Sequence, residues 1–353
     1  MEATSNSSEL PSDPSMGVRL ALHILFLVIL AAISVLGVVG NGLVIWVTGF
    51  RMPQNVTKVW FLHLAVADFT FSALLPINIA SLASGHWPFG RWLCKLYHVF
   101  TMLNMFTSVF LLTLVSLDRC VCILQPLWAR KHRTPGRLAL MATGAWGLAA
   151  AFSSPYLLYR QIFTDPWTGF MYCYNNYNLW AEGVGSGPSE GAVRRYKAHV
   201  ALNFVVGFAG PLLLICGCSG LSVARLRAGK QSLRSNRPFQ VLVAVVTAFF
   251  CCWLPLHLVT IWELEGNLAN REHPWLRDLA TPAFVLASAN SCLNPVLYSW
   301  VGQNFRRHLP CSVTSALKQA LEEDYKGSGN SDPEALELQE SRCPRAGPPG
   351  LLP

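Results

Sequence analysis

The chain has 353 residues, of which 52% are hydrophobic and only 13% are charged, a balance too apolar for a soluble domain of this length. Its formal net charge of +8 could suit a nucleic-acid binder, but the basic residues stand at the ends of apolar stretches and form no separate basic domain. Anionic membrane lipid explains that distribution better. We therefore expect a membrane protein with lipid and not nucleic acid as a partner. No hydrolase or kinase motif appears, so we expect no enzyme.

Seven apolar stretches are each long enough to cross the hydrocarbon core as a helix. Their expected ranges are 20–49, 57–83, 93–124, 138–158, 198–224, 239–263 and 276–300. The sequence thus predicts an all-α membrane protein, a seven-transmembrane helix bundle over residues 20–300, with a short amphipathic eighth helix at 301–318. The last part, 319–353, is acidic and rich in Pro and Gly, which predicts a disordered cytoplasmic tail.

The N-terminal tail, residues 1–19, is expected outside the cell. Its first 16 residues are polar and have neither the basic start nor the small-residue cleavage site of a signal peptide. Basic residues gather in the turns that follow the odd-numbered spans, which predicts that those turns are cytoplasmic. Asn6 begins a glycosylation sequon on the outer tail, whereas the sequon at Asn55 falls in an inner turn.

A carboxylate, Asp68, lies in the middle of the second span, where it needs a cation or hydrogen-bond donors. Asn104 and Ser108 are one turn apart on one face of the third span and can face it. The full set of candidate partners is Asn41, Asn104, Ser108, Asn290 and Asn294. A small cation such as sodium fits these oxygens, and the alternative is a neutral Asp68 in a structural network.

Most of the 11 cysteines lie inside the spans, where Cys packs as a small apolar residue. Cys94 and Cys173 differ, because one opens the third span on the outer side and the other lies in the loop between spans four and five. Both face an oxidising compartment and can pair. Zinc is the competing interpretation, but no His/Cys cluster with ligand spacing surrounds either residue. We expect a disulfide.

Three further motifs lie at prolines or at a span end. Asn294-Pro295 breaks the seventh span, and Trp253 precedes Pro255 in the sixth, so a small rotation there would swing the cytoplasmic half of the helix. Asp118-Arg119 closes the third span on the cytoplasmic side. By itself this acid and base pair is more typical of a solvated helix end than of a functional site.

Together these motifs resemble the rhodopsin-like family of G-protein-coupled receptors, over about residues 20–320. The matching motifs are Gly40-Asn41, Leu64-Ala65-Val66-Ala67-Asp68, Cys94, Asp118-Arg119, Trp146, Pro211, Cys252-Trp253-Leu254-Pro255 and Asn294-Pro295-Val296-Leu297-Tyr298. The resemblance implies a multi-pass plasma-membrane receptor that needs no cofactor and couples to heterotrimeric G proteins and arrestin. It also implies site residues: an allosteric sodium site at Asp68, Asn104, Ser108 and Asn290, a G-protein switch at Asp118, Arg119 and Tyr298, and a toggle at Trp253 and Pro255.

Other segments are similar to the leukocyte chemoattractant branch, with formyl-peptide and chemerin receptors nearest. They are Gly40 to Val47, His86 to Gly90, Asn104 to Phe110 and Asp118-Arg119-Cys120. This resemblance implies an extracellular peptide or lipid ligand and signalling through Gi. Formyl-peptide receptors read their ligand with an Asp in span three and two Arg in span five. The matching positions here are Met102, His199 and Asn203, so we do not expect formyl-peptide recognition.

One departure concerns signalling. The tyrosine that the family carries two turns after Pro211 is Ser219 here, and a serine hydroxyl is too short to bridge to the inner ends of spans three and seven. We therefore keep two hypotheses open. The first is a G-protein-signalling chemoattractant receptor, and the second is an atypical, decoy or arrestin-biased receptor with weak G-protein activation.

The expected ligand pocket lies at the outer ends of the spans. Its predicted lining is Met102, Met105, Phe106, Arg160, His199, Asn203, His257 and Trp262. Basic residues near the rim suit an amphipathic ligand with an acidic group, either a peptide carboxylate or a carboxylated lipid, although they are equally consistent with solvated charges. Beyond the seventh span, Cys311 is a candidate for lipidation.

Overall fold

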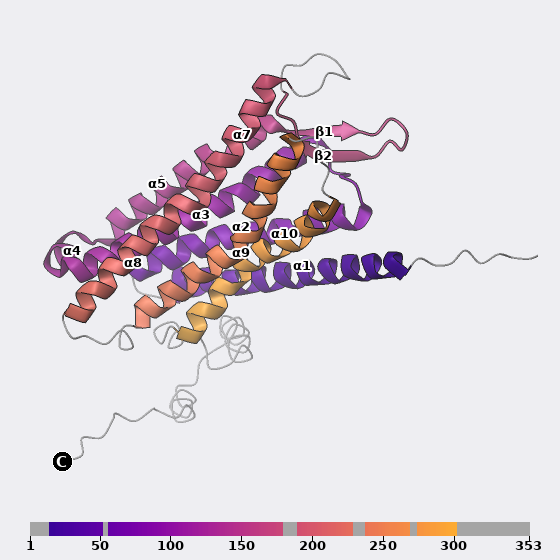
Figure 1. Ribbon diagram of the computed structural model, residues 1–353. Helices are drawn as coiled ribbons and strands as arrows, with labels where there is room; N and C mark the ends of the chain where they lie inside the picture. Colours follow the sequence, from indigo (N-terminus) through magenta and orange to yellow (C-terminus); the bar gives the residue numbers. More distant parts are fainter. Residues whose placement is uncertain (1–13, 52–55, 179–188, 229–236, 269–273, 302–353) are drawn as a thin grey trace, which may run out of the picture. The chain divides into compact units, whose positions relative to one another are not determined.

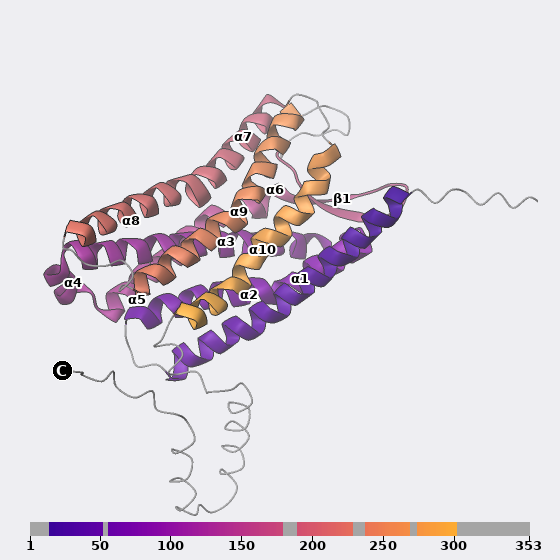
Figure 2. The same ribbon diagram turned by 60° about the horizontal axis from the view of Figure 1, so that its bottom comes forward.

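The computed structural model describes residues 14–51, 56–178, 189–228, 237–268 and 274–301. Its long helices lie side by side in one bundle, and a two-stranded hairpin covers one end (Figures 1 and 2). We call this the hairpin end. The long helices are α1 (Pro14–Trp46), α2 (Val56–Ser84), α3 (Gly90–Leu124), α5 (Pro135–Ser153), α7 (Glu190–Phe204), α8 (Gly210–Ala228), α9 (Arg237–Leu268) and α10 (Pro274–Val301).

Two of the membrane-length segments contain a π-helical turn. The turn Val47–Arg51 extends α1, and the turn Val205–Ala209 joins α7 to α8, so that α7 and α8 form one continuous span. Within the described part of the chain, five segments are long and apolar enough to cross a bilayer: Met16–Arg51, Lys58–Ser84, Gly90–Leu124, Glu190–Ala228 and Leu242–Gly266. With α5 and α10 they complete seven membrane-length segments, one over each predicted span.

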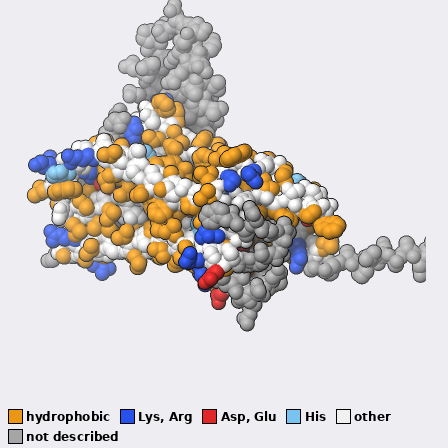
Figure 3. Space-filling view, turned by 90° about the horizontal axis from the view of Figure 1, so that it is seen from above, with side chains coloured by type: hydrophobic (Ala, Val, Ile, Leu, Met, Phe, Trp, Pro, Cys, Tyr) orange, Lys and Arg blue, Asp and Glu red, His pale blue; other side chains and the backbone are white. Residues whose placement is uncertain are grey.

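The flank of the bundle is apolar. Hydrophobic side chains are spread over much of the described surface in Figure 3, and charged side chains are few. On α1, for example, Val35 and Val39 are exposed, and in lipid such exposure costs nothing. This surface agrees with the predicted membrane protein and would be an aggregation hazard in water.

The fourth span ends earlier than expected, at Ser153 instead of residue 158, and a separate short helix, α6 (Tyr156–Tyr159), follows. The reason is Pro155, which has no N–H to donate to the carbonyl of Ala151 four residues before it. The Ser154 hydroxyl donates to that carbonyl instead, at 2.8 Å. Another helix that the sequence did not predict, α4 (Pro126–His132), follows α3.

The hairpin consists of β1 (Arg160–Thr164) and β2 (Met171–Asn175), paired antiparallel with Ile162 opposite Cys173. Its turn is ordered by Asp165, whose carboxylate accepts hydrogen bonds from the backbone N–H groups of Trp167 and Thr168. Gly169 follows with φ +71°, a conformation that favours glycine.

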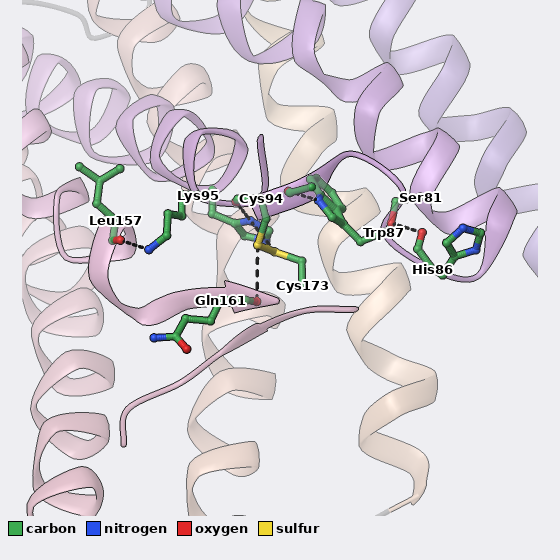
Figure 4. The surroundings of a disulfide bond; sticks show 10 residues. Ser81, His86, Trp87, Cys94, Lys95, Leu157, Gln161 and Cys173 are labelled. Atoms are coloured by element: carbon green, nitrogen blue, oxygen red, sulfur yellow. Dashed lines mark hydrogen bonds between the residues drawn. A yellow bond between two sulfur atoms is a disulfide. The ribbon is translucent and has the colours of Figure 1, made fainter. Parts of the chain in front are cut away.

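A disulfide between Cys94 and Cys173 fastens β2 to the start of α3, which confirms the predicted pairing (Figure 4). Further bonds hold the same junction. The backbone N–H of Trp87 donates to the Met171 carbonyl at 2.6 Å, and Lys95 donates to the carbonyl of Leu157. The hairpin is therefore fixed over the end of the bundle.

Close packing of α1 against α2 and α10 fixes the other side of the bundle. The Ser34 hydroxyl donates to the carbonyl of Ser72 at 2.9 Å, and the Asn41 amide donates to the carbonyl of Ser291 at 2.7 Å. Gly37 lies between these two contacts. A Cβ atom added at Gly37 would come within 2.1 Å of the Ser72 hydroxyl oxygen, so only glycine fits without movement of the helices.

We predict that Gly37→Ala lowers the stability of the folded protein, because overpacking of a tight helix contact costs about 1–3 kcal/mol. The control is Gly147→Ala on α5, where an added Cβ would have no neighbour within 4 Å. The measurement is the melting temperature of each purified variant. Equal melting temperatures for the parent and Gly37→Ala would show that α1 and α2 can separate at little cost.

Candidate functional site

A cavity of about 290 Å³ opens among α2, α3, α7, α9 and α10 at the hairpin end. Six of the eight residues predicted for the ligand pocket line it: Met102, Met105, Arg160, His199, Asn203 and His257. They come from α3, the start of β1, α7 and α9. Segments far apart in the sequence thus converge on one space, as a ligand pocket within a helix bundle requires.

The prediction was wrong for two residues. Phe106 is fully buried between helices, with its ring 5.8 Å from Phe110 and 5.6 Å from Phe152 on α5, because its position on α3 faces that helix. Trp262 is 41% exposed and packs against Trp275 of α10. On α9 the neighbouring positions Ile261 and Glu263 face the cavity instead.

An aromatic wall that the sequence analysis did not identify forms part of the lining. Tyr177 stacks on Tyr196 with ring centroids 4.6 Å apart, and Tyr156 meets His199 edge-on at 4.8 Å. Burial raises the pKa of Tyr177, which lies in the loop after β2, so its phenol is a neutral hydrogen-bonding group. The sequence signal was present but weak: tyrosines cluster on both sides of the loop that holds Cys173.

Several polar atoms on the cavity wall are buried without a hydrogen-bond partner. Among the described residues they are Tyr97 Oη, Arg160 Nε, Asn203 Oδ1, Trp253 Nε1 and His257 Nε2. These five atoms come from several elements around the cavity, and each is free to form a hydrogen bond with a molecule that enters it. The arrangement therefore suits a ligand that carries both polar and apolar groups.

Trp253 forms part of the lining where α9 carries the predicted toggle. Its side chain is 2% exposed and its ring lies 6.0 Å from that of Phe249. Pro255 follows two residues later inside the same helix, which there lacks one backbone hydrogen bond. A ligand that contacts Trp253 would therefore touch α9 beside its weakest backbone point.

Asp68 is fully buried and is held by amides from two other helices. Asn104 of α3 donates to one carboxylate oxygen at 3.2 Å, and Asn294 of α10 donates to the other at 2.7 Å. The other two predicted members, Ser108 and Asn290, are buried, and the Ser108 hydroxyl and both atoms of the Asn290 amide have no hydrogen-bond partner. The structure thus brings Asn104 and Asn294 onto the carboxylate and leaves Ser108 and Asn290 buried with unpaired polar atoms.

Asp118 forms an ion pair, but not with its neighbour Arg119. Its two carboxylate oxygens accept from Nε and Nη2 of Arg133 at 2.7 and 2.8 Å. Arg133 follows α4, so this bidentate contact fixes the loop between α3 and α5. Arg119 and Ser219 are both half-buried, on α3 and α8 respectively.

Some predicted features lie outside the described residues. They are the side chain of Tyr298, the glycosylation site Asn6, the lipidation site Cys311, positions 302–318 of the expected eighth helix and the tail 319–353.

Comparison with known proteins agrees with this architecture. Residues 40–298 match the family model of the 7 transmembrane receptor (rhodopsin family). The chain is 42% identical to N-formyl peptide receptor 2 of Macaca mulatta over 329 residues, which covers 90% of this chain and 93% of the relative. It is also 42% identical to N-formyl peptide receptor 2 of Homo sapiens over 332 residues, with the same coverage.

A mouse relative, formyl peptide receptor-related sequence 4 of Mus musculus, is 41% identical over 305 residues, 86% of this chain and 93% of the relative. These relatives are receptors and not enzymes, as expected from the missing enzyme motifs, and they imply a multi-pass plasma-membrane protein with an external ligand and a G protein as partners. With the match spanning five of the seven described membrane-length segments in full and part of the other two, the chain belongs to the rhodopsin family of seven-transmembrane G-protein-coupled receptors.

Proposed function

We propose that this receptor is of the chemoattractant type, binds an extracellular peptide or carboxylated lipid mediator in the cavity, and signals to heterotrimeric G proteins, with Gi as the expected subtype, and to arrestin. The observation that carries the proposal is Arg160. Its guanidinium lies 6.0 Å from the ring of Tyr156 in the cavity wall, and its Nε is buried without a hydrogen-bond partner. A ligand carboxylate would satisfy it.

The hairpin end is the extracellular end in this proposal, because the disulfide between Cys94 and Cys173 forms in an oxidising compartment. The N-terminus then lies outside, with Asn6 open to glycosylation, and Cys311 lies inside, where it can be lipidated. The relatives are named for N-formyl peptides. Met102, His199 and Asn203 on this cavity wall carry neither the acid nor the arginines expected for that ligand, so we favour other ligands with a carboxylate.

The test is a screen of nucleotide exchange on several G-protein subtypes and of arrestin recruitment, with acidic lipids, peptides with a free C-terminal carboxylate and N-formyl peptides. For any carboxylate agonist found, Arg160→Gln should weaken potency by about tenfold or more, because the partner of a desolvated charge is lost. The control is Arg194→Gln, which removes an exposed arginine of α7. Equal potency on the parent and Arg160→Gln would exclude a carboxylate at this position.

The alternative, a receptor with weak G-protein activation, rests on Ser219. In the family's active state a tyrosine here braces the opened helix near Arg119 and Tyr298, and only contacts that differ between two states shift their equilibrium. The half-buried Ser219 lies on α8, which packs against α3, but its hydroxyl cannot span the same gap.

We predict that Ser219→Tyr raises basal or agonist-stimulated nucleotide exchange several-fold at equal surface expression. One hydrogen bond made in the active state contributes about 0.5–1.5 kcal/mol net, which sets the size of the effect. An unchanged or lower signal would mean that α8 is braced by other residues and would remove the main argument for the decoy alternative.

We further propose that sodium binds at Asp68 and favours the inactive state. The fit is chemical: Asp68 supplies the charge, while Ser108 Oγ and the side-chain oxygens of Asn104 and Asn290 are buried and unpaired. Hard cations prefer such oxygens. Bound sodium would neutralise the buried carboxylate.

Sodium chloride should therefore raise the melting temperature of the parent above its value in choline chloride at equal ionic strength, and Asp68→Asn should abolish the difference. The stabilisation is about 1.4 kcal/mol when sodium is in tenfold excess over its Kd. Asp278→Asn, which removes an exposed acid of α10, is the control and should keep the difference. The same sodium response in Asp68→Asn and the parent would place any bound sodium elsewhere.

A further inference from the structure

The cavity contains two formal charges of opposite sign. Among the 24 described residues that line it, Arg160 and Glu263 are the sole Arg, Lys, Asp or Glu side chains. Arg160 begins β1 in the hairpin and Glu263 lies near the end of α9, so the two charges come from separate elements on the cavity wall. The proposed binding of a ligand carboxylate involves only Arg160.

The two charges interact at a distance but do not form a direct contact. The Glu263 carboxylate and the Arg160 guanidinium influence each other electrostatically, yet among the contacts of the described residues the ion pair belongs to Asp118 and Arg133 and not to them. Arg160 Nε is buried without a partner. If the pair existed only to stabilise the fold, a direct contact with satisfied hydrogen bonds would be expected.

A ligand that carried only a carboxylate would fit this cavity poorly. It would pair with Arg160 but would bring a second negative charge close to Glu263 inside a partly desolvated space, where like charges repel strongly. A ligand with a cationic group as well would pair both charges. Tyr177 and Tyr196, which also line the cavity, add aromatic faces that attract cations.

We propose that Glu263 binds a cationic group of the ligand, an amine or guanidinium, so that the cavity selects ligands that carry this group together with a carboxylate. This inference rests on the proposed function and narrows it, because short peptides carry both charges whereas simple fatty carboxylates carry one. Glu263 is thereby a specificity residue: it rejects carboxylates that lack a cation.

The first test needs no ligand. A charge that is kept for a ligand is destabilising in the empty receptor, so Glu263→Gln should raise the melting temperature of the purified protein. Glu265→Gln removes an exposed acid two residues later on α9 and should leave it unchanged. A lower melting temperature for Glu263→Gln would show that Glu263 stabilises the fold through Arg160, and would overturn the proposal.

The second test uses the dipeptide Phe-Phe as the probe in four forms: free, N-acetylated, C-amidated and blocked at both ends. In the parent, the free dipeptide should raise the melting temperature most. Glu263→Gln should weaken the binding of the free dipeptide by about tenfold or more, to the level of the acetylated form. The same variant should not weaken the binding of the acetylated form. Arg160→Gln should instead remove the advantage of a free carboxylate.

The proposal is overturned if the free and acetylated forms raise the melting temperature of the parent equally. It is also overturned if none of the four forms raises it. The proposed signalling function can be tested separately from the role of Glu263. Suppose that a carboxylated lipid without an amine activates the parent and Glu263→Gln with equal potency. This result would uphold a carboxylate receptor and reject the role of Glu263. If the free dipeptide binds as expected but no ligand causes nucleotide exchange or arrestin recruitment, the role of Glu263 is upheld and the proposed signalling function is rejected.

Discussion

The hydrogen bonds of one buried carboxylate connect the centre of this receptor. Asp68 accepts from Asn104 of α3 and Asn294 of α10, and is itself part of α2. In a membrane, where helices gain nothing from hiding apolar surface from water, such polar contacts are one of the few forces that select a particular packing. The neighbouring bond from Asn41 to the Ser291 carbonyl adds α1 to the same assembly.

The hairpin end depends on a different constraint. The disulfide between Cys94 and Cys173 joins residues 79 positions apart, and so fixes a loop that would otherwise have many conformations. Because β1 pairs with β2, the bond also sets the position of Arg160, which starts the paired strand. One covalent link thus helps to position a charge that lines the cavity, together with the backbone bond from Arg160 to the Tyr156 carbonyl.

Between these two regions lies α9, with Trp253 on the cavity wall and Pro255 just beyond it. At the end opposite the hairpin, Asp118 is paired with Arg133. In the proposed function, a ligand that moves Trp253 would act on a helix that lacks one backbone hydrogen bond at Pro255, and through that helix it would change the end opposite the hairpin.

The seven spans, the disulfide partners and the membership of the family could be predicted from the sequence, because they depend on local properties: apolar length, the placement of two cysteines, and motifs such as Asn294-Pro295 at fixed positions. Asp68 was also recognisable, since a carboxylate within an apolar stretch needs partners wherever it lies. The choice between its candidate partners was not, because it depends on how helices rotate against one another.

Only the tertiary structure decided which side of each helix faces the cavity. Phe106 and Trp262 were expected in the pocket and lie outside it, whereas Glu263, next to Trp262 in the chain, lies inside. One residue along a helix changes direction by about 100°, so an error of one position moves a side chain from ligand to lipid. The partner of Asp118 was equally hidden, since Arg133 approaches it through a loop whose path is set by packing and not by sequence spacing.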